Sequence, residues 1–240
     1  MSKKHLKRIA APNFGKVSRK QSTWITRPNP GPHPLNQCLT LDFIVREKFG
    51  FADTLKESKK SIKSGQILVD QKVVLDHKRP IGIMDVVSLN NQNYRVVLNK
   101  KNLLELINIP DNQKNLKLCK VIGKKTLKKG KIQVNLHDGR NLLVSDEKIK
   151  VNDSVILELS KGEIKEHIPF EKGCALYLTG GSHPGTVAFF EGVKKTSGLV
   201  PDLLVVKSGK DVFETAKIYA FVVGKSAPSL VIGSVKEGKK

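Results

Sequence analysis

This sequence of 240 residues is poor in aromatic side chains, in cysteine and, over its first forty residues, in negative charge. Aromatic residues make up 5% of the chain, which argues against a surface that binds single-stranded nucleic acid mainly by stacking bases. The three cysteines, Cys38, Cys119 and Cys174, form no C-x-x-C pair, so neither a disulfide framework nor a zinc knuckle is expected. They are consistent with a reducing, intracellular environment.

Long apolar segments are also missing. No run approaches the roughly 18 residues of a membrane span, and the first residues lead into no signal-peptide hydrophobic core. The sequence therefore predicts a soluble protein with no membrane partner.

Catalytic and metal-binding patterns are not found either. The six histidines are dispersed, with no two at metal-ligand spacing. Gly180 and Gly185 have the separation of a phosphate-binding loop, but Thr186 and Val187 follow where Lys and Ser or Thr are required. Asp85, in an apolar stretch, is either a buried catalytic acid or, as we favour, a carboxylate satisfied by backbone donors. We expect no enzyme, cofactor, metal or small-molecule substrate.

What the chain has in excess is positive charge. It carries 43 Lys and Arg against 22 Asp and Glu, a formal net charge of +21 with an isoelectric point near 9.9. Residues 1–41 hold 8 basic and 0 acidic residues, and residues 91–131 hold 11 basic and 2 acidic residues. A lysine run alone is usually a solvated face, but two such blocks favour a polyanionic partner, above all nucleic acid.

The acid-free leader ends where Asp42 supplies the first carboxylate. Its hydrophobic residues are scattered, and the prolines of the segment 27–34 oppose helix and inner strand. We predict an extended basic arm with a stiff Pro-rich hinge. Trp24, the only tryptophan, either anchors this arm in a protein groove or stacks against a base.

A compact module follows. Apolar spacing predicts one helix over 39–49, and a Thr-x-x-Glu capping box with a terminal glycine predicts a second over 54–64. The second helix would bury Leu55, Ser58 and Ile62 and expose a ridge of four lysines. A hairpin is expected over 67–75, in which Gln71 is a poor turn residue, and a strand over 81–89.

The second half is predicted to be rich in β-structure. The Asp-Gly turn at 138–139 lies between strands 132–136 and 141–144, and a similar hairpin joins 155–159 to 164–168. Short strands are expected at 175–178, 186–190, 203–206, 212–215 and 218–223, at the spacing of a small barrel.

Several stretches together resemble the archaeal and eukaryotic family of small-subunit ribosomal protein four, e-type, nearly end to end. They are His-Leu-Lys-Arg-Ile-Ala-Ala-Pro (5–12), Arg-Pro-Asn-Pro-Gly-Pro-His-Pro-Leu (27–35), Ile-Val-Arg-Glu (44–47), Gly-Ile-Met-Asp-Val-Val (82–87), Leu-His-Asp-Gly-Arg-Asn (136–141) and Thr-Gly-Gly (179–181). The resemblance implies a multi-domain α+β protein. Its parts would be a basic extended arm (1–38), a two-helix-plus-sheet RNA-binding domain of the ribosomal-protein-four type (39–90), a central β-rich domain (91–170) and a KOW-type, SH3-like barrel with a basic tail (171–240).

The resemblance and the charge pattern together give the expected rRNA contacts. These are Lys3, Lys4, Lys7, Arg8, Lys16, Arg19, Lys20, Trp24, Arg27, Arg46, Lys56, Lys59, Lys60, Lys63, Arg79, Lys124, Lys125, Lys128, Lys129, and the glycine-rich turn Gly180, Gly181 and Gly185. Ser182-His183-Pro184 departs from the Arg-containing turn common in the family, which weakens the case for phosphate contact there.

The function implied is that of a structural constituent of the small ribosomal subunit, cytoplasmic and ribosome-bound in single copy, with rRNA and neighbouring ribosomal proteins as partners. One alternative is an RNA-modifying enzyme, such as a pseudouridine synthase, that carries the same binding module. Residues 91–240 show no catalytic motif for it. A KOW-containing transcription factor is a further alternative, for which no second domain is evident.

Overall fold

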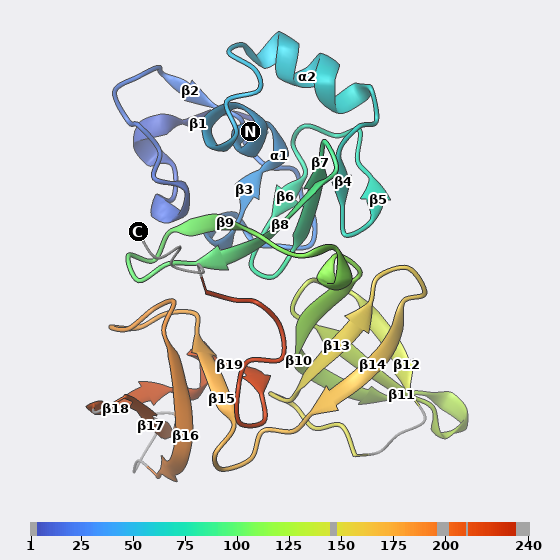
Figure 1. Cartoon of the computed structure of the whole chain (residues 1–240), viewed down its shortest axis with the longest axis vertical. Coiled ribbons are helices and arrows are strands. Elements are labelled where there is room, and N and C mark those ends of the chain that lie inside the picture. The colour runs from blue at the N-terminus through green and yellow to red at the C-terminus, as the bar shows by residue number, and fades with distance from the viewer. Residues whose placement is uncertain (1–3, 145–147, 196–201, 210, 234–240) are drawn as a thin grey trace. The chain divides into compact units, whose positions relative to one another are not determined.

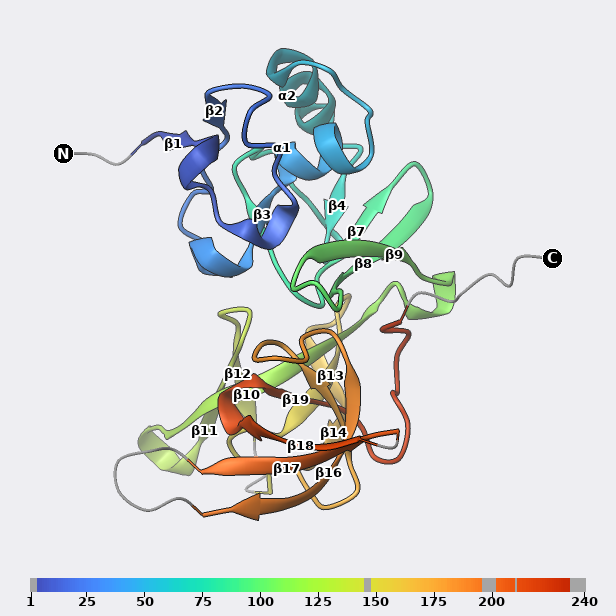
Figure 2. The ribbon, with the colours of Figure 1, turned by 90° about the vertical axis from the view of Figure 1, so that its left-hand side faces the viewer.

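The computed structural model describes residues 4–144, 148–195, 202–209 and 211–233. In these residues the fold is mostly β-sheet, with two short α-helices and several short 3-10 turns. The chain divides into two compact units, which are shown in Figures 1 and 2. The first comprises Met1–Val96, Leu103–Lys117 and His137–Arg140, and the second comprises Val97–Asn102, Leu118–Leu136 and Asn141–Lys240. No helix in the described part of the chain is long and apolar enough to span a membrane.

The first unit is built on a five-stranded sheet of order β5-β4-β7-β8-β9. Its strands are β4 (Leu68–Val69), β5 (Lys72–Val73), β7 (Val86–Leu89), β8 (Gln92–Leu98) and β9 (Leu104–Asn108). A two-stranded pair joins β3 (Leu39–Thr40) to β6 (Pro80–Ile81). The helical elements are α1 (Leu41–Phe43), a π-helical turn (Ile44–Lys48) and α2 (Leu55–Lys63). Leu41, Ile44 and Ile62 are fully buried in the core of this unit.

The helix expected over 39–49 is present in altered form. Residues 39 and 40 form β3, and the Thr40 side chain accepts a hydrogen bond from the Phe43 N–H, so the helix begins at Leu41. Its continuation is π-helical, and Gly50 ends it with a positive φ of 67°. The strand expected over 81–89 is split into β6 and β7, because Met84 has a φ of 66° that a strand does not accommodate.

The hairpin expected over 67–75 is confirmed, although it is shorter. Asp70 and Gln71 form its two-residue turn with φ values of 51° and 62°, as a turn with two left-handed residues requires. The Asp70 carboxylate accepts a hydrogen bond from the Val86 N–H at 3.1 Å, and the Gln71 amide donates to the Lys114 carbonyl at 3.1 Å. These tertiary contacts hold Gln71 in a conformation that its type does not favour.

The leader differs from the extended arm that the sequence suggests. Strands β1 (Leu6–Lys7) and β2 (Trp24–Ile25) pair antiparallel within it, and Ala11 and Gly15 are buried. A Cβ on Gly15 would lie 2.7 Å from the Leu39 side chain, so the chain passes directly against the core there. A few apolar residues are enough to hold the leader against the core, because they lie at these contacts. The leader is therefore part of the fold of the first unit.

Strands β8 and β9 of the five-stranded sheet lie in the basic block 91–131. Strand β8 alternates exposed and buried residues at its start and is then fully buried, and Arg95 within it is 0% exposed. The Arg95 guanidinium donates to the Leu116 carbonyl at 2.9 Å and to the Gln113 carbonyl at 3.3 Å. Part of the positive charge of this block is therefore structural.

A buried ionic cluster centres on Lys117, which is 1% exposed. Its ammonium lies 2.7 Å from Asp70 Oδ2, 2.6 Å from Asp85 Oδ1 and 3.0 Å from Asp138 Oδ2. Arg140 adds contacts to Asp70 at 2.7 Å and to Asp138 at 3.3 Å. We call these residues the Lys117 cluster. It ties together three carboxylates that are 15 or more residues apart in the sequence.

The cluster settles the role of Asp85, which is buried and fully engaged. Besides Lys117, it accepts hydrogen bonds from the Gly82 N–H at 2.9 Å and from His33 Nε2 at 2.9 Å. Burial opposes its ionisation, but the Lys117 ammonium and the His33 ring outweigh it and hold the pKa of Asp85 well below its usual range. Asp85 is thus a structural carboxylate that receives backbone and side-chain donors.

The second unit contains two five-stranded sheets. One has the order β12-β11-β10-β13-β14, with β10 (Leu116–Thr126), β11 (Ile132–Leu136), β12 (Asn141–Val144), β13 (Ser154–Glu158) and β14 (Glu163–Ile168). The other has the order β18-β17-β16-β15-β19, with β15 (Ala175–Leu178), β16 (Val187–Lys194), β17 (Leu203–Ser208), β18 (Asp211–Ala216) and β19 (Ala220–Gly224). Both hairpins predicted from turn signals are confirmed.

Alternation explains the core of the first of these sheets. Along β11, Ile132, Val134 and Leu136 are buried and the residues between them are half-buried. They pack with Cys119, Val121 and Val155 in one apolar cluster. All three cysteines are buried and free of disulfide bonds, and burial raises the pKa of Cys38 to about 11.

Replacement of Lys117 by Met is predicted to lower the free energy of unfolding by about 3–5 kcal/mol, because it leaves buried carboxylates without their counter-ion. Chemical denaturation of the purified protein measures this. Lys100, which is exposed, serves as the control, and its replacement by Met is predicted to change the free energy by less than about 0.5 kcal/mol. Equal effects of the two variants would contradict the structural role of the cluster.

His137 makes stability depend on pH. Burial and the nearby Lys117 lower its pKa to about 4, and its Nε2 lies 3.3 Å from the Ile83 carbonyl oxygen. Between about pH 6.5 and pH 4 the unfolded chain therefore binds a proton that the folded chain does not, so acidification favours unfolding. In the variant with Gln in place of His137, the free energy of unfolding is predicted to fall less over this range, by up to about 3 kcal/mol. Denaturation curves at pH 7 and pH 4.5 measure the free energy of unfolding of both proteins. An equal fall in the wild-type protein and the variant would contradict this assignment.

Candidate nucleic-acid interface

The lysine ridge of α2 is the clearest basic surface in the first unit. The helix starts at a capping box, in which Thr54 accepts a hydrogen bond from the Glu57 N–H at 3.3 Å and the Glu57 carboxylate accepts one from the Thr54 N–H at 3.4 Å. Ser58 and Ile62 are buried, as predicted, whereas Leu55 is 38% exposed. Lys56, Lys60 and Lys63 are exposed and Lys59 is half-buried, all within three turns of helix.

The leader adds exposed cations and the one tryptophan. Lys4, Lys7, Lys16 and Lys20 are exposed. Trp24 is 55% exposed, with the Lys7 ammonium 5.9 Å and the His5 ring 5.6 Å from its ring centroid. A tryptophan buried in a groove would show little of its ring, so this exposure favours stacking on a ligand over anchoring the leader.

Three arginines predicted to contact RNA have internal partners instead. Arg8 is 3% exposed, forms an ion pair with Glu47 and donates to the Ser22 hydroxyl at 2.8 Å. Arg19 donates to the carbonyls of Ile9 and Ala11. Arg46 lies 3.5 Å from Asp42 Oδ2 with its side chain 26% exposed.

These contacts correct the prediction for Arg8, because its guanidinium is buried by the ion pair and cannot reach a phosphate. Arg19 is exposed and Arg46 is half-buried, so each forms its contacts within the protein while part of its side chain still reaches solvent. The sequence does not show whether these arginines lie at the surface or in the interior, because an arginine that contacts RNA and one that forms an internal ion pair can both occur in a basic segment.

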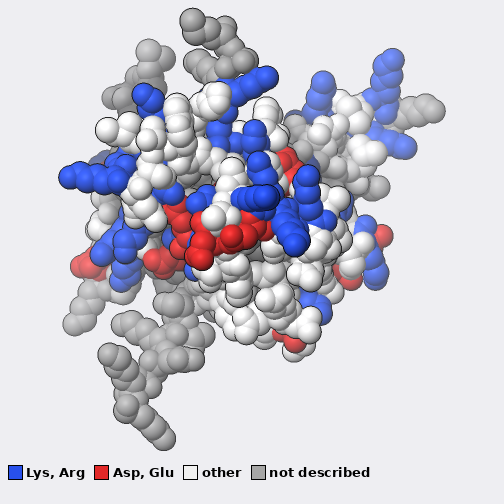
Figure 3. All heavy atoms as spheres, turned by 90° about the horizontal axis from the view of Figure 1, so that it is seen from above, with Lys and Arg blue, Asp and Glu red and all other residues white. Residues whose placement is uncertain are grey.

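Three further cations of the first unit, Arg27, Lys78 and Arg79, belong to the Pro-rich segment or to a loop that contacts it. Arg27 and Arg79 are half-buried, and Lys78, which the sequence reasoning did not select, lies between Arg79 and His77 in the same loop. The only sequence signal for Lys78 is that loop's run of three basic residues. On the face shown in Figure 3, Lys and Arg side chains project at several places, with groups of carboxylates between some of them.

In the second unit the predicted basic contacts lie on β10 and the turn after it. Lys124 and Lys125 are exposed on β10, and Lys128 is exposed in the following 3-10 turn. The side chain of Lys129, like the whole of Lys3, lies outside the described residues. A second lysine of β10, Lys120, points inward and donates to the Ala220 carbonyl at 2.6 Å, and burial lowers its pKa to about 8.

The glycine-rich turn makes close approaches to its own chain. A Cβ on Gly180 would lie 2.6 Å from the Tyr219 ring, and one on Gly185 would lie 2.5 Å from the backbone of Asn99, at a φ of 69°. Gly181 has a φ of 83°. Packing within the second unit therefore accounts for these glycines, independently of any ligand.

Catalytic chemistry finds no support in the described part of the chain. No group of three or more His, Cys, Asp or Glu side chains there is placed to hold a metal ion. The buried carboxylates Asp70, Asp85 and Asp138 are engaged by Lys117, Arg140 and His33 in and beside the Lys117 cluster. The exposed functional groups are chiefly lysines, which suit phosphate contacts.

Comparison with known proteins accords with this picture. The family model described as Ribosomal family S4e matches residues 90–164, and the RS4NT (NUC023) domain matches residues 2–36. The protein named small ribosomal subunit protein eS4 of Methanocaldococcus jannaschii is 40% identical over 237 residues, covering 94% of this chain and 96% of its own. Its namesake in Methanococcus aeolicus is 41% identical with the same coverage.

A solved structure is also similar. The crystal structure of the 30S ribosomal protein S4e from Thermoplasma acidophilum superposes with a TM-score of 0.70 at 30% sequence identity, covering 79% of this chain and 96% of that one. Similarity of this extent in both sequence and fold shows that the chain belongs to the S4e family of ribosomal proteins.

Proposed function

We propose that this chain is a structural constituent of the small ribosomal subunit and acts by binding rRNA, without catalysis. The observation that carries the proposal is the end-to-end similarity to proteins named as small-subunit ribosomal proteins, combined with a net charge of +21. The relatives reported above are all named as ribosomal proteins, which disfavours the RNA-modifying enzyme. The place of action is then the cytoplasmic ribosome, in single copy, beside neighbouring ribosomal proteins.

The rRNA contacts proposed are exposed or half-buried cations, because an accessible ammonium or guanidinium can release counter-ions from phosphates while the protein keeps its fold. Arg19 and Arg46 are left out because contacts within the protein hold their side chains. The set comprises Lys4, Lys7, Lys16, Lys20, Arg27, Lys56, Lys59, Lys60, Lys63, Arg79, Lys124, Lys125 and Lys128, with Trp24 as a stacking group. The α2 ridge leads this set, since a capped helix holds its lysines in fixed order on one surface.

The finer division of the chain is also proposed. Residues 39–90 would be the RNA-binding domain, 91–170 a central β-rich domain, and 171–240 a KOW-type barrel. In support of the last, β15 to β19 form one antiparallel sheet of five short strands with a register shift in β16 between Phe190 and Gly192, and such irregularities accompany strong sheet curvature. The folded leader, 1–38, would present its cations from the surface of the first unit.

The α2 ridge is tested by replacing Lys56, Lys59, Lys60 and Lys63 with Gln. Binding to small-subunit rRNA, measured at salt concentrations from 50 to 200 mM, is predicted to weaken, and the slope of log affinity against log salt is predicted to fall by about 3. The helix should persist by circular dichroism, because glutamine has a helix propensity close to that of lysine.

The matched control removes four exposed lysines outside the proposed set, Lys150, Lys165, Lys172 and Lys207. This control lowers the net charge equally, so it measures the non-specific share of the effect. An equal loss of slope in the two variants would refute a localised contact on α2.

A further inference from the structure

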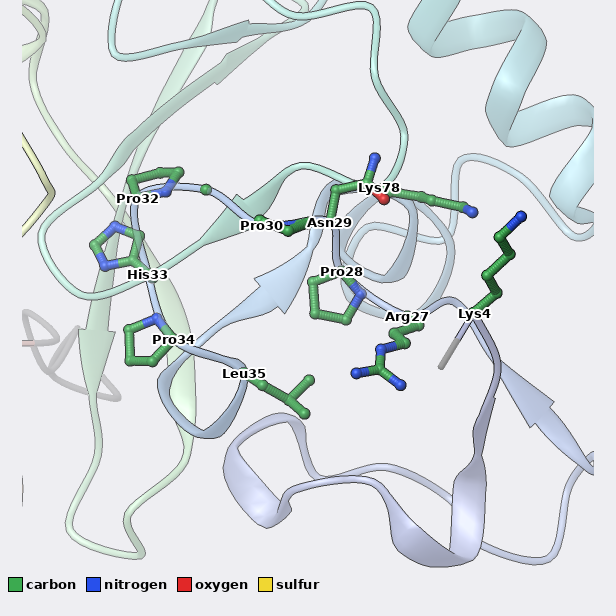
Figure 4. Close-up of a pocket in the computed structure, with 11 residues that line it drawn as sticks. Lys4, Arg27, Pro28, Asn29, Pro30, Pro32, His33, Pro34, Leu35 and Lys78 are labelled. Atoms are coloured by element: carbon green, nitrogen blue, oxygen red, sulfur yellow. The ribbon is translucent and has the colours of Figure 1, made fainter. Parts of the chain in front are cut away.

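The Pro-rich segment Arg27–Leu35, together with Lys4 and Lys78, lines a solvent-open cavity of about 710 Å³ (Figure 4). This volume is in the range of about 300–1,000 Å³ that small-ligand sites occupy. All of its walls belong to the first unit. Neither the family relationship nor the net charge explains the presence of this cavity.

The wall of the cavity is held rigid from behind. Pro28, Pro30, Pro32 and Pro34 fix every second φ angle of the segment. The Asn29 N–H donates to the Lys78 carbonyl at 3.0 Å, and the Asn29 amide donates to Asp76 Oδ2 at 2.9 Å. A Cβ on Gly31 would lie 2.7 Å from the Pro80 ring, so the segment passes directly against it.

His33 connects this wall to the Lys117 cluster. Its ring is buried, and its Nε2 lies 2.9 Å from Asp85 Oδ2 and 3.1 Å from Oδ1. The Gly82 backbone packs so closely on the ring that a Cβ there would lie 2.4 Å from it. The cavity is therefore pre-organised, which lowers the entropic cost of filling it.

The lining offers positive charge and a proline-rich backbone that is poor in hydrogen-bond donors. Lys4, Arg27 and Lys78 are its charged groups, and among the residues that the structure describes no Asp or Glu lines it. The four prolines have no N–H, so residues 28–35 carry half of the backbone donors that eight residues would otherwise have, while the carbonyls of Pro34 and Leu35 already accept hydrogen bonds from Gln37 and Cys38. A matching ligand is anionic, presents donors and has a flat apolar face that can lie on proline rings or on the Arg27 guanidinium plane.

An unstacked ribonucleotide has these properties together. Its phosphate is anionic, its 2′-hydroxyl and exocyclic amino groups donate, and splayed-out bases stack on arginine planes in RNA complexes. An acidic peptide would supply the charge and N–H donors, but its Asp and Glu side chains carry no flat face to lie on the proline rings or on the Arg27 guanidinium plane. In Figure 4 the Lys4 and Lys78 ammonium groups end on the same side of the view, away from Pro32 and Pro34.

We propose that this cavity receives a single nucleotide extruded from rRNA, with its phosphate between Lys4 and Lys78 and its base against Arg27 and the proline wall. The proposal rests on the proposed function, because it names the RNA element that one part of the interface binds. It assigns to the Pro-rich segment a recognition role in addition to its place in the fold.

The test maps small-subunit rRNA, bound to the protein, by chemical probing of base edges and 2′-hydroxyls at nucleotide resolution. The wild-type protein is predicted to give one nucleotide that is unpaired and has a protected base edge. Replacement of Arg27 by Met is predicted to remove that protection, and replacement of both Lys4 and Lys78 by Met to weaken binding about tenfold and remove it too. Thermal melting checks that each variant stays folded.

The matched control replaces Lys60 and Lys63 by Met, which removes the same charge from α2. It is predicted to weaken binding and to leave the protected nucleotide in place. If the cavity variants and the control gave the same footprint, the cavity proposal would be overturned while rRNA binding stood. If the wild-type protein did not bind rRNA at all, the proposed function itself would fail.

A photo-reactive phenylalanine analogue in place of Leu35 distinguishes the occupants in the assembled small subunit. A crosslink to one rRNA nucleotide, the same one that the probing identifies, supports the proposal. A crosslink to an acidic segment of a neighbouring protein overturns it.

Discussion

The contact of the Lys117 ammonium with Asp70, Asp85 and Asp138 is the interaction on which the first unit most depends. A lone ammonium or carboxylate in a protein interior carries a large desolvation cost, and here each charge is compensated by several partners. The three carboxylates come from a hairpin turn, from the residue before β7 and from the turn after β11. Through Asp85 and His33 the same cluster also fixes the wall of the Pro-rich cavity. Stability and the shape of a candidate binding site thus share one set of ion pairs.

The basic residues of this chain divide into two groups with different duties. Arg8, Arg95 and Lys117 are buried and bonded to carboxylates or carbonyls, so they hold the fold together. Lys56, Lys60 and Lys63 of α2 and Lys4, Lys7, Lys16 and Lys20 of the leader are exposed and remain available to a polyanion. A net charge alone does not separate these groups. The separation matters for function, because the exposed residues set the salt dependence of RNA binding whereas the buried ones set stability.

Features governed by local chemistry could be predicted from the sequence. The capping box of α2 and the Asp-Gly turn between β11 and β12 depend on residues a few positions apart, and both are present. Features that depend on distant residues could not. Arg95 of strand β8 lies in a basic block, so the sequence does not predict that it is buried. Its burial depends on the carbonyls of Gln113 and Leu116, which accept its hydrogen bonds. The positive φ of Gln71 and the link from His33 to Asp85 likewise exist only because the tertiary structure supplies partners.

We propose that this chain works as a member of the small ribosomal subunit, held there by rRNA. Sedimentation of a lysate of the organism's cells on a density gradient, followed by detection of this chain in each fraction, tests it most directly. The chain is expected to travel with the small subunit at low salt and to be released as the salt concentration rises, because phosphate contacts lose affinity with salt. Recovery at the top of the gradient at every salt concentration, or only with the large subunit, would contradict it.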